Sequence, residues 1–244
     1  MNPSMQTNPM PDDIPYIQSQ QKKISALVTK RFKRFYLTGG TALSFLFKHR
    51  FSEDLDFFTQ AYSPREPDHV MKVISDQTGF PHELKDEQNG PKLVPMKVFN
   101  LQLKGGRGLK IDFVQDYAKN LGKVKGGLHS VDDIYLRKIV AAIGQQSRET
   151  EIGMPLPTGR QSVKDVFDLY TLSRKKEPLT EFFLRHFSPA QAERLMAWYR
   201  GFNRMDLKLE LLDTVPGADT GELLQYLDDE ILRRLPDALI NHRR

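Results

Sequence analysis

The sequence has no cysteine among its 244 residues. Without cysteine there is no disulfide and no thiolate-bound zinc, and such a chain suits a reducing compartment. No apolar run reaches the roughly 18 residues needed to cross a bilayer, and the N-terminus lacks the pattern of a secretion signal. We therefore expect a cytoplasmic protein with no membrane partner.

Composition and charge are those of an ordinary globular protein with a small basic excess. Apolar residues make up 39% of the chain and charged residues 27%. Lysine and arginine number 36 against 31 acidic residues, which gives a formal net charge of +5. This excess suits a polyanionic partner, although it is too small to identify one.

The pattern of apolar residues changes twice along the chain. Residues 1–20 are rich in Pro, Asn, Gln and Met and have few core-forming residues, which predicts a flexible N-terminal arm. Residues 21–125 mix helical and strand-like periodicities, whereas residues 126–244 are helical in pattern throughout. We therefore predict an α+β fold, in which a domain with a mixed sheet precedes a helical domain.

Short strand and helix signals alternate within the mixed domain. A serine followed by a proline is a good helix start, because serine caps the helix and proline suits its first turn. The segment KGGRG between two alternating apolar runs predicts a β-hairpin. The predicted helices cover 21–33, 41–48 and a segment that starts at Ser63-Pro64, and the predicted strands cover 35–38, 54–59, 93–103 and 109–114.

Three aspartates of this domain indicate a metal site. Residues i and i+2 of a strand share a face, about 6.6 Å apart, so Asp54 and Asp56 present two carboxylates together. A third, Asp112, interrupts the apolar run LKIDFV, where an acidic side chain is costly unless it has a partner. If the two strands are neighbours, the carboxylates converge and need cations, and Mg²⁺ prefers oxygen ligands.

A glycine pair, Gly39-Gly40, stands between a predicted strand and a predicted helix. Such a turn lets a phosphate approach backbone N–H groups and the positive end of the helix dipole. Alone, the glycines predict a turn, the DLD segment a solvated strand edge, and Asp112 a side chain bonded to backbone N–H groups. Their order along the chain favours one joint function, in which a metal-bridged triphosphate lies between the glycine turn and the carboxylates.

The order of these residues resembles the polymerase-β-like nucleotidyltransferase superfamily. Within it, the sequence LTGGTAL…HRFSEDLDFF is similar to the N-terminal sequence motif of the AbiEii/AbiGii toxin family. A second similarity lies in the helical half, and the resemblance spans about residues 30 to 175. The first signature consists of Gly39, Gly40, Thr41, Arg50, Ser52, Asp54 and Asp56, and the second of Lys138, Ala141, Arg160, Lys164, Asp165, Asp168 and Leu169.

The resemblance implies a role for each of these residues. Asp54, Asp56 and Asp112 would hold Mg²⁺ or Mn²⁺, with Asp112 as general base. Lys138 would contact nucleotide phosphates, and Asp165 would orient this lysine or the acceptor. Plainer interpretations stay open, namely a snorkelling Lys138 and a solvated charged face that includes Asp168. The implied catalytic residues are Asp54, Asp56, Asp112, Lys138 and Asp165, and the implied nucleotide-binding residues are Gly39, Gly40, Thr41, Ser52, Lys138, Arg160, Lys164 and Asp168.

The chain departs from the family pattern between its two helical signatures. The segment GQQSRETEIGMPLPT separates Lys138 from Arg160, whereas the family runs almost directly from the lysine helix to the arginine. Its glycines and prolines predict a loop over residues 146–158. Arg148 could match the family arginine, but the K-D-x-x-D context favours Arg160.

The resemblance implies a metal-dependent enzyme that moves a nucleoside monophosphate from a nucleoside triphosphate to an acceptor hydroxyl and releases pyrophosphate. It implies the toxin of a toxin–antitoxin system, with a cognate antitoxin and with tRNA or other RNA as acceptor. Arginines of the helical half could line an RNA path, although scattered arginines are usually solvated. Two alternatives remain: the same fold acting on a protein or a small molecule, and a non-catalytic nucleotide-binding module. The complete carboxylate set argues against the second.

Overall fold

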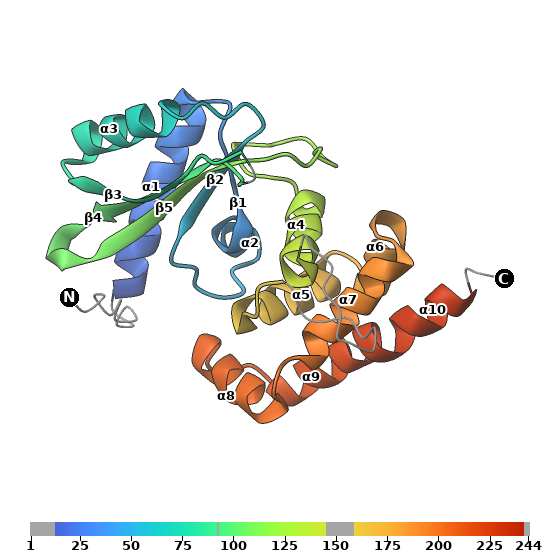
Figure 1. Ribbon diagram of the computed structural model, residues 1–244. Coiled ribbons are helices and arrows are strands. Elements are labelled where there is room, and N and C mark those ends of the chain that lie inside the picture. The colour runs from blue at the N-terminus through green and yellow to red at the C-terminus, as the bar shows by residue number, and fades with distance from the viewer. Residues whose placement is uncertain (1–12, 92, 145–158, 242–244) are drawn as a thin grey trace. The chain divides into compact units, whose positions relative to one another are not determined.

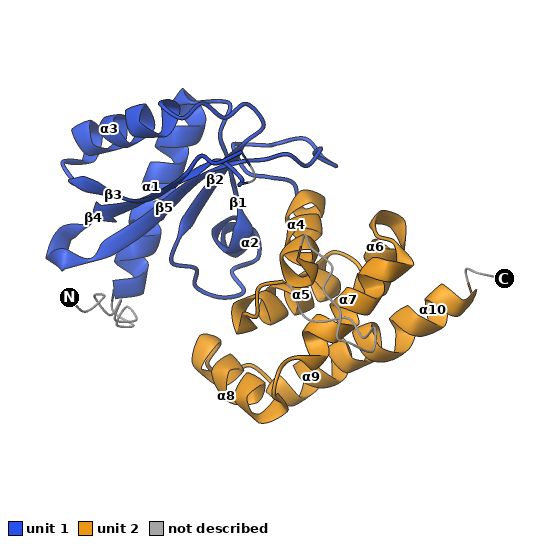
Figure 2. Cartoon of the chain, in the orientation of Figure 1, with its two compact units in different colours: residues 1–130 blue, residues 131–244 orange. Residues whose placement is uncertain are grey.

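The computed structural model describes residues 13–91, 93–144 and 159–241. The chain divides into two compact units, residues 1–130 and residues 131–244 (Figures 1 and 2). The division falls a few residues beyond the expected domain boundary after residue 125. A search of the helices in these ranges finds none long and apolar enough to span a membrane.

Unit 1 contains a five-stranded mixed sheet with helices packed around it (Figure 1). Its elements are α1 (Ile14–Arg31), β1 (Tyr36–Thr38), α2 (Gly39–Phe47), β2 (Leu55–Thr59), α3 (Glu66–Thr78), β3 (His82–Gln88), β4 (Met96–Gln102) and β5 (Gly108–Gln115). The strand order is β1-β2-β5-β4-β3. Strands β2 and β5 are parallel, and the other neighbouring pairs are antiparallel. The predicted hairpin is therefore the β4–β5 pair.

The two faces of the central strands differ in chemistry, because side chains alternate along a strand. Phe57 of β2 and Phe113 of β5 are fully buried on one face, where their rings stack with centroids 5.5 Å apart. Lys97 pairs in register with Phe113, and its Nζ lies 2.6 Å from Asp68 Oδ2, so α3 lies over this face. The opposite face of the same strands carries Asp56 and Asp112.

Helix α1 begins earlier than we predicted. Residues 14–20, expected to belong to the flexible arm, form its first two turns, and residues 1–12 lie outside the described ranges. Pro15 suits the first helical turn, because an N–H at this position would have no partner within the helix. Ile17, in the same segment, is buried. The polar composition concealed this start, since two of the glutamines, Gln20 and Gln21, are themselves buried.

Two other elements of unit 1 differ from the prediction. Strand β3, with the sequence HELKDEQ, was not predicted because it has no apolar alternation. It lies at the sheet edge, where charged side chains protect the open hydrogen-bonding groups from pairing with another chain. Helix α3 has Arg65 at its N-cap and Pro67 in its first turn, so the start predicted at Ser63-Pro64 was too early.

Unit 2 is helical within its described residues, as the sequence predicted. Its elements are α4 (Val131–Ile143), α5 (Val163–Lys175), α6 (Leu179–His186), α7 (Pro189–Arg200), α8 (Arg204–Thr214), α9 (Thr220–Leu227), a π-helical segment (Asp228–Arg234) and α10 (Leu235–Asn241). Tyr135 stacks on Phe182 in the core, and Trp198 is fully buried. Ser188 caps α7 in a capping box with Gln191. The predicted loop 146–158 lies outside the described residues.

Candidate active site

Two of the three predicted carboxylates are direct neighbours in the sheet. Asp56 of β2 and Asp112 of β5 are register partners on adjacent parallel strands, so their side chains share one face. Asp54 immediately precedes β2. Lys110, two residues before Asp112, lies among them, with its Nζ 2.7 Å from Asp112 Oδ2 and 3.6 Å from Asp54 Oδ2. Sequence reasoning missed this lysine, because it alternates with apolar residues as any half-exposed strand residue would.

Asp112 lies in a strongly perturbed environment. Its exposed fraction is 7%, and its Oδ1 is buried with no hydrogen-bond partner among the described residues. Burial raises the pKa of Asp112 above its ordinary value, although Lys110 acts in the opposite direction. Burial lowers the pKa of Lys110, but the bond to Asp112 and the nearby charges of Asp54 and Asp56 raise it by more. Lys110 is therefore held as a cation beside the carboxylates.

The donor set suits a hard divalent cation. It offers three carboxylates, one of which has a buried oxygen without a hydrogen bond, and hard cations take oxygen ligands. In the described part of the chain, no three acidic or histidine side chains are already grouped around a common metal position. Lys110 instead contacts Asp112 and Asp54 with its ammonium. It therefore competes with a cation for these carboxylate oxygens.

The glycine pair lets side chains of the site pack closely against its backbone. Gly39 has a φ of 70°, and a Cβ added there would lie 2.5 Å from Asp56 Oδ2. A Cβ on Gly40 would lie 2.8 Å from Arg50 Nη2 and 2.9 Å from Ser52 Oγ. Any larger residue would displace these groups, because real Cβ contacts are longer. The missing Cβ atoms thus allow Asp56, Arg50 and Ser52 to pack directly against the turn.

Hydrogen bonds fix the loop that precedes Asp54. Thr41 Oγ1 donates to the carbonyl of Asp54, and Ser44 Oγ donates to the carbonyl of Arg50 at 2.8 Å. Gln21 Nε2 of α1 donates to the carbonyls of Ser52 and Glu53 at 2.8 and 3.0 Å. The predicted residues Thr41 and Ser52 therefore lie beside the carboxylates, where Thr41 supports the backbone. Gln21 and Ser44 were not predicted, since nothing in their local sequence marks them.

His129 supports the same turn from the other side of β1. Its buried ring lies on Tyr36, with centroids 4.5 Å apart, and its Nδ1 is 3.1 Å from Thr38 Oγ1. Its Nε2 is 3.1 Å from Asn120 Oδ1. Thr38 is the register partner of Asp56 and precedes Gly39, so this histidine positions the backbone of the site. The sequence carried no signal for it.

The predicted residues of unit 2 form a separate buried ionic cluster. Lys138 Nζ lies 2.7 Å from Asp165 Oδ1 and 2.6 Å from Asp168 Oδ2. Both aspartates are fully buried, and Lys138 is nearly so. The interpretations of Lys138 as a snorkelling lysine and of Asp168 as part of a solvated face were therefore wrong. The i, i+3 spacing in α5 places both carboxylates on the helix face that meets α4.

Arg160 closes this cluster from the solvent side. Its Nε and Nη2 each lie 2.7 Å from an oxygen of Asp165, a bidentate pair, while 63% of its side chain stays exposed. Burial raises the pKa of Asp165, but Lys138 and Arg160 together outweigh it and hold the pKa below its ordinary value. Lys164, which precedes Asp165 in α5, is also exposed. Arg160 and Lys164 are therefore accessible to a ligand, whereas Lys138 is largely enclosed.

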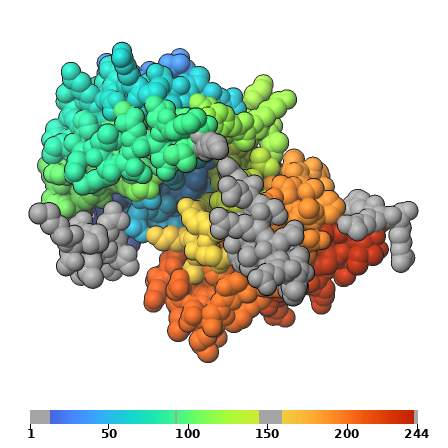
Figure 3. Space-filling model, viewed as in Figure 1, coloured from blue at the N-terminus to red at the C-terminus, as the bar shows by residue number. Residues whose placement is uncertain are grey.

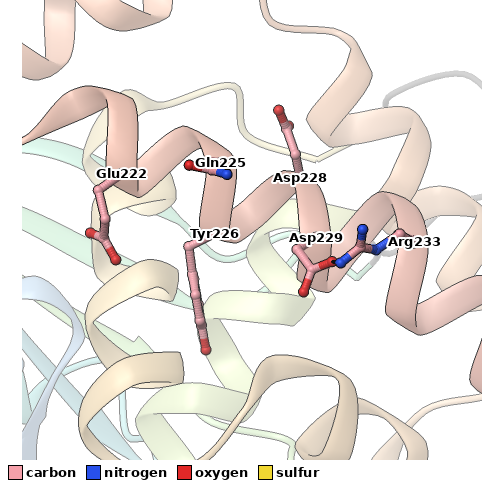
Figure 4. Close-up of a pocket in the computed structure, with 6 residues that line it drawn as sticks. All are labelled: Glu222, Gln225, Tyr226, Asp228, Asp229 and Arg233. Atoms are coloured by element: carbon pink, nitrogen blue, oxygen red, sulfur yellow. Dashed lines mark ion pairs between the residues drawn. The ribbon is translucent and has the colours of Figure 1, made fainter.

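A surface cavity of about 520 Å³ lies elsewhere in unit 2. Figure 4 shows its lining along α9 and the π-helical segment, where Asp229 and Arg233 form an ion pair. Three carboxylates and a single arginine would repel a triphosphate, and none of the predicted residues contributes. The lining consists of Glu222, Gln225, Tyr226, Asp228, Asp229 and Arg233. We assign the site by the carboxylate geometry of unit 1 rather than by this cavity.

The family model for the nucleotidyl transferase AbiEii toxin of a type IV toxin–antitoxin system matches residues 26–241. The chain belongs to this family. As an AbiEii nucleotidyltransferase, it is an enzyme of the class that the glycine turn and carboxylates predicted. The match also covers the last helices, which lay beyond the part of the sequence that carried the resemblance.

Solved structures show that this AbiEii chain shares its fold with known proteins. JHP933 from Helicobacter pylori is 18% identical with a TM-score of 0.57, and the alignment covers 96% of this chain and 98% of that one. A candidate nucleotidyltransferase from H. pylori is 18% identical with a TM-score of 0.52, and 96% of each chain is covered. A search of curated proteins found no match. At this identity the likeness supports the α+β nucleotidyltransferase fold alone.

Proposed function

We propose that this AbiEii nucleotidyltransferase transfers a nucleoside monophosphate to a hydroxyl of RNA, tRNA included, in a reaction that depends on Mg²⁺ or Mn²⁺. The observation that supports it most is the register pairing of Asp56 with Asp112 on parallel strands. It places two carboxylates side by side, next to a glycine turn and with one buried oxygen of Asp112 lacking a hydrogen bond. A nucleoside triphosphate is the substrate that family membership implies, and a cognate antitoxin is a further partner.

The carboxylates have distinct roles in this proposal. Asp54, Asp56 and Asp112 would hold the metal, which when bound would stabilise negative charge on the triphosphate. Asp112 accepts the proton of the acceptor hydroxyl. The hydroxyl oxygen then forms a bond to the α-phosphorus while the bond to the pyrophosphate breaks. The liberated pyrophosphate carries away the electron pair of that bond.

The glycine turn and its supports bind the triphosphate. The N–H groups of Gly40 and Thr41 lie in the first turn of α2, where backbone donors and the helix dipole favour an anion. Ser52 stands beside this turn through its contact with Gly40. Lys110 neutralises part of the carboxylate charge before metal binds, which limits the mutual repulsion of the three aspartates.

The residues of unit 2 contribute through Arg160 and Lys164, the accessible cations of the second signature. We propose that both bind phosphate groups of the substrates. Lys138, Asp165 and Asp168 are then positioning residues, because they hold Arg160 through the bidentate pair with Asp165. This assignment replaces direct phosphate contact by Lys138, whose ammonium is already bonded to two buried carboxylates.

Transfer of label tests this proposal. The protein is incubated with each α-labelled nucleoside triphosphate, Mg²⁺, and either total RNA or total protein. We expect label in RNA, no label with EDTA, and none with Asp56→Ala. Asp76→Ala is the matched control, since Asp76 is an exposed acidic residue of α3. Label in protein or in a small molecule would show that the acceptor is not RNA. Undiminished transfer by Asp56→Ala would refute the metal site.

A further inference from the structure

The loop that follows β5 carries accessible positive charge. We call residues 117–128 the exit loop, and in Figure 1 it leaves the end of β5 and projects away from the sheet. Lys119, Lys123 and Lys125 are exposed, and none of them forms an ion pair with a carboxylate in the described part of the chain. The sequence has no acidic residue between Asp116 and Asp132. The exit loop therefore carries a net charge of +3, which no acidic residue within the loop compensates.

The exit loop packs against the C-terminal end of α1. Gly127 lies so close to Thr29 that an added Cβ would collide with its side chain, and its carbonyl accepts the N–H of Leu37 at 2.8 Å. This end of α1 is also basic and free of acidic residues, because none occurs between Asp13 and Glu53. Together they form what we call the basic surface, which consists of Lys30, Arg31, Lys33, Lys119, Lys123 and Lys125, all exposed.

Exposed apolar side chains interrupt the lysines of the exit loop. Tyr117 is 73% exposed, Leu121 is 45% and Val124 is 38%. Figure 3 shows this part of the chain, in yellow-green, standing on the molecular surface. A flat, accessible tyrosine among lysines suits a ligand that alternates bases with phosphates, since bases stack on aromatic rings and lysines attract the backbone.

The exit loop ends beside the carboxylate site. It starts where the Asp116 N–H donates to the carbonyl of Thr59 at 2.8 Å. It returns to β1, where the His129 N–H donates to the carbonyl of Leu37 at 3.0 Å and the His129 ring contacts Thr38. Thr38 pairs with Asp56 in the sheet. A chain that lies along the exit loop is thereby led toward the reacting carboxylates.

We infer that the basic surface and Tyr117 bind single-stranded RNA and guide the acceptor end to the carboxylate site. This inference rests on the proposed function, because it assigns the acceptor of that reaction a path within unit 1. Sequence reasoning had placed the RNA path among the arginines of the helical half. Several of these instead form ion pairs, such as Arg185 with Glu177 and Arg204 with Asp228. An acidic protein segment would match the lysines, whereas RNA matches both the lysines and Tyr117, because every nucleotide carries a phosphate and a base.

Binding of a labelled RNA, measured by fluorescence anisotropy without nucleotide, tests the inference. The probe is a single strand of about 12 nucleotides, a length within the range of roughly 4–16 nucleotides that a single-strand-binding fold covers. Each phosphate contact adds about 0.7 to the slope of log affinity against log salt, so Lys119→Gln/Lys123→Gln/Lys125→Gln should lower the slope by about 2. Tyr117→Ala should weaken binding by about tenfold. The matched control is Lys72→Gln/Lys85→Gln/Lys104→Gln, an equal charge change at exposed lysines of α3, β3 and the β4–β5 turn.

The outcomes separate this inference from the proposed function. Loss of binding in the exit-loop variant and in Tyr117→Ala, with the control unchanged, supports the RNA surface even if no label ever enters RNA. Equal affinity and slope in the exit-loop variant and the control overturns it, and so does a wild-type protein that does not bind RNA. A poly-glutamate peptide that competes as well as RNA, with Tyr117→Ala without effect, would assign the surface to an acidic protein instead.

Discussion

Replacing Lys138 with methionine tests whether the buried ionic cluster of unit 2 holds that unit together. The substitution keeps an unbranched side chain with good helix propensity but removes the ammonium that contacts both Asp165 and Asp168. Asp165 keeps Arg160, while the fully buried Asp168 loses its ion pair with Lys138. Breaking one partner of a buried pair costs about 3–5 kcal/mol, so we expect a loss of about 3 kcal/mol at pH 7.

The single tryptophan is a local probe of this loss. Trp198 is fully buried in α7, and its Nε1 donates to the carbonyl of Arg160 at 2.9 Å, next to the cluster. Its fluorescence in a urea titration therefore reports the unfolding of the unit that contains the cluster. The control is Lys175→Met, an exposed lysine of α5, the helix that carries Asp165 and Asp168, and for it we expect a change within about 0.5 kcal/mol.

The pH dependence of the same titration has a definite sign. The pKa of Asp165 is lowered in the folded state from its ordinary value of 3.8, so its contribution is present above that pH and is lost as the pH falls through the lowered value. The difference between wild type and Lys138→Met should therefore shrink in acid. Adding Asp168→Asn to Lys138→Met should recover at least about 1 kcal/mol, because it removes a buried charge that no longer has Lys138 as a partner. A Lys138→Met protein within about 1 kcal/mol of wild type at pH 7 would refute the reasoning.

Three further predictions concern unit 1. Gly39→Ala should abolish label transfer, because the added Cβ would collide with Asp56. The control is Gly79→Ala, since Gly79 has the same φ of 70° but open space around it. This control should lose only about 1–2 kcal/mol of stability in a thermal melt. Asp112→Asn should raise the melting temperature in EDTA at pH 7, since burial disfavours its ionised form, while transfer is lost; a lower melting temperature would contradict this. Lys110→Met should let Mg²⁺ raise the melting temperature by more than in wild type, because the competing ammonium is gone; an equal rise would show that Lys110 does not compete with the metal.

The sequence predicted the parts of the fold that depend on local patterns. The β4–β5 hairpin follows from alternating apolar residues around a glycine turn. Strand β3 could not be predicted, since an edge strand made of charged residues has no apolar face. The start of α1 was missed because buried glutamines look like solvent-exposed residues in a composition.

The candidate site was predictable where side chains and their spacing carry the chemistry. Asp54, Asp56, Asp112 and the glycine pair could be named because an aspartate in an apolar strand is costly without a purpose. The supporting residues could not, since Gln21, Lys110 and His129 reach the site through pairings distant in sequence. The burial of Lys138 was equally hidden, because a lysine among apolar helix residues has the same pattern whether its ammonium reaches solvent or pairs inside.

The parallel pairing of β2 with β5 determines when the proposed carboxylate site can first form during synthesis of the chain. Asp56 and Asp112 face each other only after α3, β3 and β4 have been made and the last strand has been inserted at the centre of the sheet. Such non-local pairing forms slowly, because the long intervening segment must close before the contact gives any stabilisation. A nascent or truncated chain that ends before β5 therefore has no carboxylate pair. The pair can form only once the chain has been made through Gln115.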